Sequence, residues 1–78
     1  MSMMDQIEAI FRNAVSAGMC AYVEIAAIGR DETDITVVRP KPLAAVIDTY
    51  RKTYNDDGVH RMNDQLKIVR AGITNISM

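Results

Sequence analysis

The sequence predicts an α+β fold, a two-layer sandwich in α-β-β-α-β order with a three-stranded, mainly antiparallel sheet and two helices on one face. Two segments repeat apolar residues every three or four positions, as amphipathic helices do. Three short segments either repeat their residue pattern every two positions or are rich in β-branched residues, as strands do. With 78 residues, 49% of them apolar and 24% charged, the chain fits one small globular domain over residues 1–78.

The first predicted helix covers about residues 4–17. Its apolar residues form one stripe, made of Met4, Ile7, Ile10, Phe11, Ala14 and Val15. Ser2 or Asp5 can cap its start, since Asp5 and Glu8 have the spacing of a capping box. Gly18 is expected to end the helix, because glycine adopts the left-handed conformation that closes many helices.

The next two segments predict an antiparallel hairpin. After Gly18 the apolar period changes from about 3.6 to 2, which indicates a strand over residues 20–28. Polar, turn-forming residues at 29–34 separate it from a β-branched run at 35–39. The short polar connection favours pairing of these two strands.

A second helix is predicted over residues 42–54. Pro40 and Pro42 stop the preceding strand, because proline has no N–H for the ladder. The apolar stripe of this helix consists of Leu43, Val46, Ile47, Tyr50 and Tyr54. The turn formers at 55–58 end it, and residues 59–65 are predicted as a loop with room for a short helical turn.

Residues 66–76 predict the final strand. Gly72 lies inside it and is expected to mark a bulge. A hairpin turning at Ala71 and Gly72 is the weaker alternative, since neither standard two-residue turn favours alanine first. A final strand that returns beside the first one gives the strand order two, one, three.

The first strand is apolar on both of its sides, which points to a contact surface. If water covered the sheet face opposite the helices, polar residues should occupy every second position there. Whichever side meets the helices, the other side keeps large apolar residues. The candidate interface residues of both alternatives are Tyr22, Val23, Ile25, Ile28, Val37 and Val38. We therefore predict an exposed apolar patch and, from it, a homodimer or a protein-binding face.

A different interpretation is that this patch is scattered and covered by long basic side chains, whose stems can lie on apolar surface.

The basic residues also raise the question of whether the protein binds nucleic acid. The net charge of −1 provides no long-range field for a polyanion, so nucleic acid is disfavoured as a partner. The best case for it is a clustering in space of Arg39, Lys41, Arg51, Lys52, Arg61, Lys67 and Arg70.

Catalytic chemistry has little support in the sequence. Cys20 and His60 are the only residues from which a thiol nucleophile and an imidazole base could be assembled. Cys20 lies among apolar residues and is expected to be buried, and His60 lies in a polar loop and is expected to be solvated. No ligand spacing for a metal and no glycine-rich phosphate loop is present. We predict no catalytic, cofactor-binding or metal-binding residue.

The expected setting is the cytoplasm. The longest apolar stretch has about ten residues, whereas a membrane-spanning helix needs about 20. A single cysteine cannot form an internal disulfide, and the start of the chain has no pattern of a secretory signal.

The leading functional hypothesis is a small, non-enzymatic protein-interaction domain that forms a homodimer and binds a larger macromolecule. A nucleic-acid-binding or regulatory domain is the alternative, followed by a small enzyme using Cys20 and His60.

Overall fold

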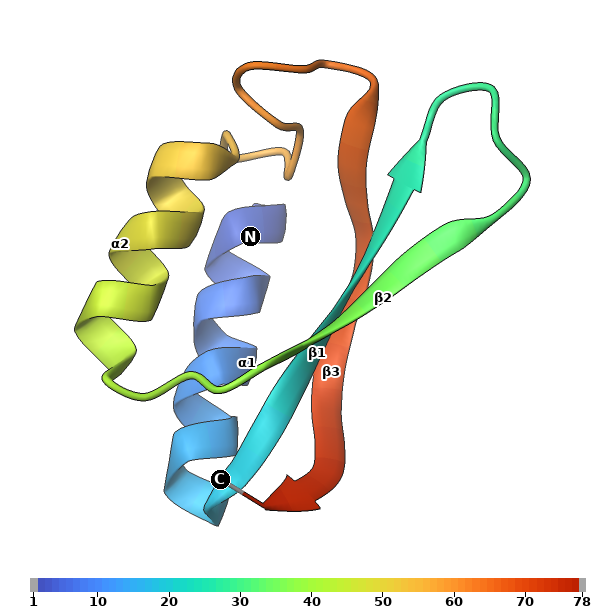
Figure 1. Cartoon of the computed structure of the whole chain (residues 1–78). Helices are drawn as coiled ribbons and strands as arrows, with labels where there is room; N and C mark the ends of the chain where they lie inside the picture. The colour runs from blue at the N-terminus through green and yellow to red at the C-terminus, as the bar shows by residue number, and fades with distance from the viewer. Residues whose placement is uncertain (1, 78) are drawn as a thin grey trace.

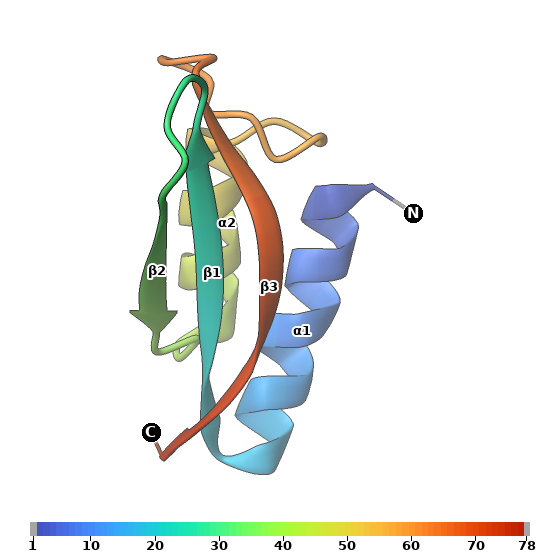
Figure 2. The same ribbon diagram turned by 90° about the vertical axis from the view of Figure 1, so that its right-hand side faces the viewer.

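The order of elements in the computed structural model, which describes residues 2–77, is that expected from the sequence (Figure 1). The elements are α1 (Met3–Ala17), β1 (Met19–Ala27), β2 (Thr33–Val38), α2 (Leu43–Thr53) and β3 (Leu66–Ser77). The strands form one antiparallel sheet in the order β2-β1-β3, and both helices lie on the same side of it (Figure 2). The predicted α+β class, element order and strand order are confirmed.

Helix α1 begins and ends where local chemistry dictates. The backbone N–H of Asp5 donates to Oγ of Ser2 over 3.1 Å, so Ser2 is the N-cap. Gly18 has φ 68° and its N–H bonds to the carbonyls of Ala14 and Val15. Of the two candidate caps, Ser2 therefore performs the role, and Asp5 is left for a contact with α2.

The hydrophobic core lies between α1 and the sheet. Phe11 is fully buried at its centre, and it packs with Val23 of β1 and Ile68 of β3. Helix α2 contributes less, because none of its residues is fully buried and its apolar stripe is only partly covered. The ring of Tyr50 meets that of Phe11 edge to face, with centroids 5.2 Å apart. Helix α2 thus packs mainly against the side of α1.

The connection from α2 to β3 is extended rather than helical. Val59 forms an antiparallel bridge with Lys67, and His60 forms one with Tyr54. The first bridge adds a pairing beside the start of β3. Residues 59–65 therefore form the predicted loop, and the short helical turn for which it had room does not occur. The local sequence lacks apolar periodicity, and the pairing comes from the neighbouring strand.

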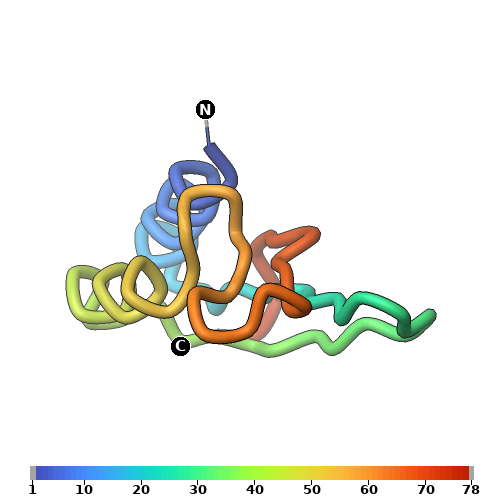
Figure 3. The backbone as a smooth tube through the Cα atoms, turned by 90° about the horizontal axis from the view of Figure 1, so that it is seen from above, coloured from blue at the N-terminus to red at the C-terminus, as the bar shows by residue number. Residues whose placement is uncertain are grey.

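The β1–β2 hairpin projects beyond the two helices. Figure 3 shows the ends of both strands and their connecting loop extending away from the helical layer. Thr33 and Asp34 belong to β2 although their side chains are polar, because they pair with Ala26 and Ile25. The second strand is therefore longer at its start than the β-branched run predicts.

Candidate interaction surface

The sheet face turned away from the helices is called here the outer face, and alternate residues of all three strands form it. Its residues are Tyr22, Glu24 and Ala26 of β1, Thr33, Ile35 and Val37 of β2, and Lys67, Arg70 and Gly72 of β3. The intervening residues Ala21 and Val23 of β1 are fully buried against the helical layer. Figure 2 shows the outer face with no helix in front of it.

The ring of Tyr22 lies across β3 at Gly72. A Cβ atom at position 72 would come within 2.7 Å of Cε1 and Oη of Tyr22. The two residues are paired in register, so the bulge expected at Gly72 is wrong. The irregularities fall on either side, between Met19 and Ala21 and between Glu24 and Ile25. Glycine is required here because an aromatic ring approaches the backbone closely, and not because the strand contains a bulge at this position.

An ion pair occupies the middle of the outer face. Nη2 of Arg70 lies 3.1 Å from Oε1 of Glu24, and only 16% of the Glu24 side chain is exposed. Each charge is thereby neutralised by its neighbour on the adjacent strand. The aliphatic stem of Arg70 and the ring of Tyr22 give this part of the sheet an amphipathic surface.

Strand β2 supplies the exposed apolar side chains of the outer face. Ile35 is 60% exposed and Val37 is 48% exposed, and the whole strand except Val38 is classed as exposed. Ile35 was not among the candidate interface residues. Its separation of two positions from Val37 is the signal that could have identified it, since residues two apart share a face of a strand.

The structure divides the candidate interface residues among the outer face, the core side of the sheet and the loop after β1. Tyr22 and Val37 lie on the outer face, whereas Val23 is fully buried and both Ile25 and Val38 pack against the core. Ile28 follows the end of β1 and is 73% exposed. The side of the sheet that carries Tyr22 and Val37 is therefore the one left free by the helices.

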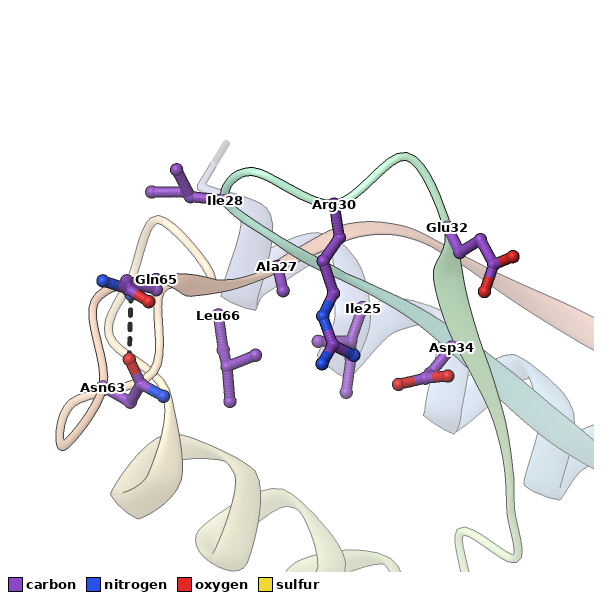
Figure 4. A pocket seen from close by; sticks show the side chains of 9 residues that line it. All are labelled: Ile25, Ala27, Ile28, Arg30, Glu32, Asp34, Asn63, Gln65 and Leu66. Carbon is purple, nitrogen blue, oxygen red and sulfur yellow. Dashed lines mark hydrogen bonds between the residues drawn. The ribbon is translucent and has the colours of Figure 1, made fainter.

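A cavity of about 330 Å³ opens beside the projecting hairpin (Figure 4). Its apolar lining comes from Ile25, Ala27, Ile28 and Leu66, and its polar lining from Arg30, Glu32, Asp34, Asn63 and Gln65. The side chain of Asn63 accepts a hydrogen bond of 3.1 Å from the backbone N–H of Gln65. The sequence did not predict this concavity, because its two walls are far apart in the chain. Neither Cys20 nor His60 lines it.

The two candidate catalytic residues lie at opposite ends of the sheet. Cys20 is fully buried, as expected, and its Sγ is 3.8 Å from the carbonyl oxygen of Ser77. His60 neighbours the bridge between Val59 and Lys67, and Lys67 pairs with Ala26. Ala26 lies six positions along the strand from Cys20, which corresponds to about 20 Å. The fold does not bring the thiol and the imidazole together.

His60 is partly buried rather than fully solvated. Its ring meets that of Tyr54 edge to face, with centroids 5.3 Å apart. Its Nδ1 accepts a hydrogen bond of 3.1 Å from the backbone N–H of Met62. These contacts give His60 a role in ordering the loop before β3. Within residues 2–77, no group of three or more His, Cys, Asp or Glu side chains is placed to hold a metal ion.

Several of the candidate basic residues are neutralised by acidic neighbours. Lys52 pairs with Asp48 over 3.0 Å, and Arg70 pairs with Glu24. Arg61 donates from Nε to the carbonyl oxygen of Arg51 over 3.1 Å. Arg39 and Lys41 lie apart from these pairs, on either side of the buried Pro40. This pairing lowers the positive charge available to a polyanion.

Arg51 joins the two helices. Its Nη2 donates to Oε2 of Glu8 and, over 3.2 Å, to Oδ1 of Asp5. The guanidinium lowers the pKa of both carboxyl groups below their ordinary values, mainly through these hydrogen bonds. The two carboxylates therefore hold α2 against α1, rather than forming the capping box that their spacing suggested.

Neither helix in the described part of the chain is long and apolar enough to cross a membrane. Comparisons with protein-family models, with curated proteins and with solved structures found no match for this chain.

Proposed function

We propose that this chain is a small, non-enzymatic protein-interaction domain that forms a homodimer and binds a larger macromolecular partner. The observation that carries the proposal is the exposure of β2, which presents Ile35 and Val37 on a sheet face that no helix covers. A neighbouring molecule would remove these side chains from water, which favours association. The single buried cysteine supports a cytoplasmic location within this proposal.

The composition of the outer face also fits a protein partner. Protein interfaces are enriched in aromatic residues and arginine, with charged groups depleted or paired at their centres. Tyr22 and the Glu24–Arg70 ion pair lie beside the two aliphatic side chains of β2. In this part of the outer face a partner can contact aromatic, aliphatic and guanidinium groups whose charges are already paired. The charge of Lys67, which forms no ion pair with another described residue, lies on the same face beside Ala26.

The other two functional classes have weaker support. Nucleic-acid binding would use the basic side chains, but Arg51, Lys52 and Arg70 already have acidic partners. An enzyme built on Cys20 and His60 would have to bring together a buried thiol at the start of β1 and an imidazole in the loop that lies beside the other end of this strand. No observation on the molecule favours either class over a binding surface.

The proposal is tested by site-specific photocrosslinking in cells that naturally produce the protein. A photoreactive residue replaces Ile35 on the outer face or, as the matched control, Ala44, an exposed residue of α2. We expect discrete crosslinked species, identified by mass spectrometry, from position 35 and not from position 44. Equal crosslinking from both positions, or none from position 35, would contradict the proposed surface.

A further inference from the structure

Strand β2 is an open edge of the sheet. Its only strand neighbour among the described residues is β1, and their register runs without a bulge from Thr33 to Val38. An edge strand leaves every second N–H and C=O group without a partner from the sheet. Natural edges are usually protected by proline, charged side chains or a bulge. Strand β2 has no proline, lysine or bulge within its length, and its one charged residue is Asp34, near its start.

The side chains of β2 are well suited to further pairing. Every residue of the strand except Asp34 is β-branched, and such residues favour the extended conformation. Figure 2 shows β2 at the margin of the sheet, with neither helix reaching past it. An approaching strand would therefore meet the backbone of β2 without displacing the helical layer.

The charged residues around β2 are mainly acidic at the start of the strand and basic after its end. Its start carries the acidic residues Asp31, Glu32 and Asp34, with one arginine, Arg30, beside them. Its end is followed by the basic residues Arg39 and Lys41. All of these side chains are exposed, and none forms an ion pair with another described residue. The edge thus has an acidic end and a basic end whose charges are not balanced within the chain.

We infer that β2 pairs in antiparallel fashion with β2 of a second copy of this chain. Antiparallel pairing places the acidic end of one strand beside the basic end of the other, and parallel pairing would place like charges together. In a dimer with a two-fold axis, the acidic end of each strand lies beside the basic end of the other strand, so the interface is self-complementary. This inference rests on the proposed function and identifies the second copy as the occupant of the β2 edge.

The side chains also select a register. With Thr36 on the two-fold axis, opposite Thr36 of the second copy, Ile35 faces Val37 of the second copy on the outer face. The same register brings Asp31 toward Lys41 of the second copy. Pairing joins the two sheets into one, and the outer faces become a continuous surface with the four aliphatic side chains at its centre. The dimer thereby enlarges the surface proposed for the larger partner.

The interface is formed by one short strand, so it is smaller than the roughly 1,600 Å² typical of stable complexes. The charged ends are exposed to solvent, and salt therefore screens their attraction. We expect a dimer at submillimolar concentration in low salt, with a dissociation constant that increases markedly in high salt. Sedimentation equilibrium of the purified protein measures both. A monomer of 8.7 kDa at submillimolar concentration in low salt would overturn the inference.

A charge exchange tests whether the charged ends of β2 lie at the interface. One variant combines Arg39→Glu with Lys41→Glu, and the other combines Asp31→Lys with Glu32→Lys. Each variant alone should be a monomer, and an equimolar mixture should form a heterodimer, because only the mixture restores opposite charges. The control variant exchanges Asp48 and Lys52, an exposed ion pair on α2, and should dimerise as the wild type does. Circular dichroism verifies that every variant is folded.

The register has a separate test. Residues directly opposite in an antiparallel pair have Cα atoms about 4.5–5.5 Å apart, a separation that a disulfide can span. Thr36→Cys should therefore give a covalent dimer on mild oxidation, and Ala44→Cys on α2 should not. Equal crosslinking of the two variants would overturn the register. If each charge variant alone still dimerises, the β2 edge is not the interface, although the homodimer of the proposed function survives.

Discussion

Single residues on this sheet are constrained mainly by their neighbours on the adjacent strand. Gly72 is the clearest case, because its own segment indicates a bulge, whereas the structure pairs it with Tyr22 and fills the missing Cβ position with the tyrosine ring. No pattern within residues 66–76 contains that information. The partner of a strand glycine depends on a register that joins residues 50 positions apart.

The Tyr22–Gly72 contact predicts a coupled effect of two substitutions. Gly72→Ala should destabilise the wild-type protein by about 1 kcal/mol, because the new Cβ displaces the ring. In a Tyr22→Ala background the same change should be neutral or stabilising, since alanine has less backbone freedom to lose on folding than glycine. Urea unfolding of all four proteins measures the coupling. Additive effects would show that the ring does not occupy the space above Gly72.

At the scale of elements, helix α2 combines a partly buried apolar stripe with one ion-pair cluster that links it to α1. None of its residues is fully buried, and Arg51 reaches Asp5 and Glu8 of α1. The sequence predicted the helix and its apolar stripe, because both follow from local periodicity. It did not predict that its basic residue would pair with the first turns of the other helix, because this contact depends on how the two helices pack.

The Arg51 cluster predicts a pH-dependent contribution to stability. The pKa values of Asp5 and Glu8 are lower in the folded state than in the unfolded state. Their contribution is therefore complete above the unfolded pKa values, near pH 4, and is lost as the pH falls through the lower folded values. Arg51→Met should lower the Tm by a few degrees at neutral pH, and this difference should vanish in acid.

Calorimetry of the wild type and the variant across this pH range measures the effect of Arg51. Arg12→Met is the matched control, because Arg12 bonds to Glu8 over 2.9 Å within α1 and does not connect the helices. Its effect on the Tm should be smaller. A difference between wild type and Arg51→Met that persists unchanged in acid would contradict an electrostatic role for Arg51.

At the scale of the whole molecule, the main consequence of the fold is the choice of which side of β1 meets the helices. Both sides of this strand carry large apolar residues, so each choice is compatible with the sequence. The structure buries Val23 and leaves Tyr22 on the outer face beside Val37. That choice determines which side chains are available to a second molecule and which are required for the fold.

Two matched substitutions test this division. Val23→Asp should abolish folding, because it places a charge without a partner in the core. Val37→Asp should leave the domain folded, since this side chain is 48% exposed, while weakening self-association. Circular dichroism and sedimentation distinguish the two effects. A folded Val23→Asp protein, or an unfolded Val37→Asp protein, would show that the two faces had been assigned the wrong way round.

The sequence by itself determined the helices, the strands, their order and the α+β class, because each of these follows from periodicity and turn chemistry within a short segment. Only the tertiary structure decided which flank of β1 is covered, where Arg51 binds, why position 72 needs glycine, and that a cavity opens beside the hairpin. The physical reason is that these features are contacts between segments far apart in the chain. Their geometry depends on packing the whole domain, and a local pattern that fits two faces equally well cannot choose between them.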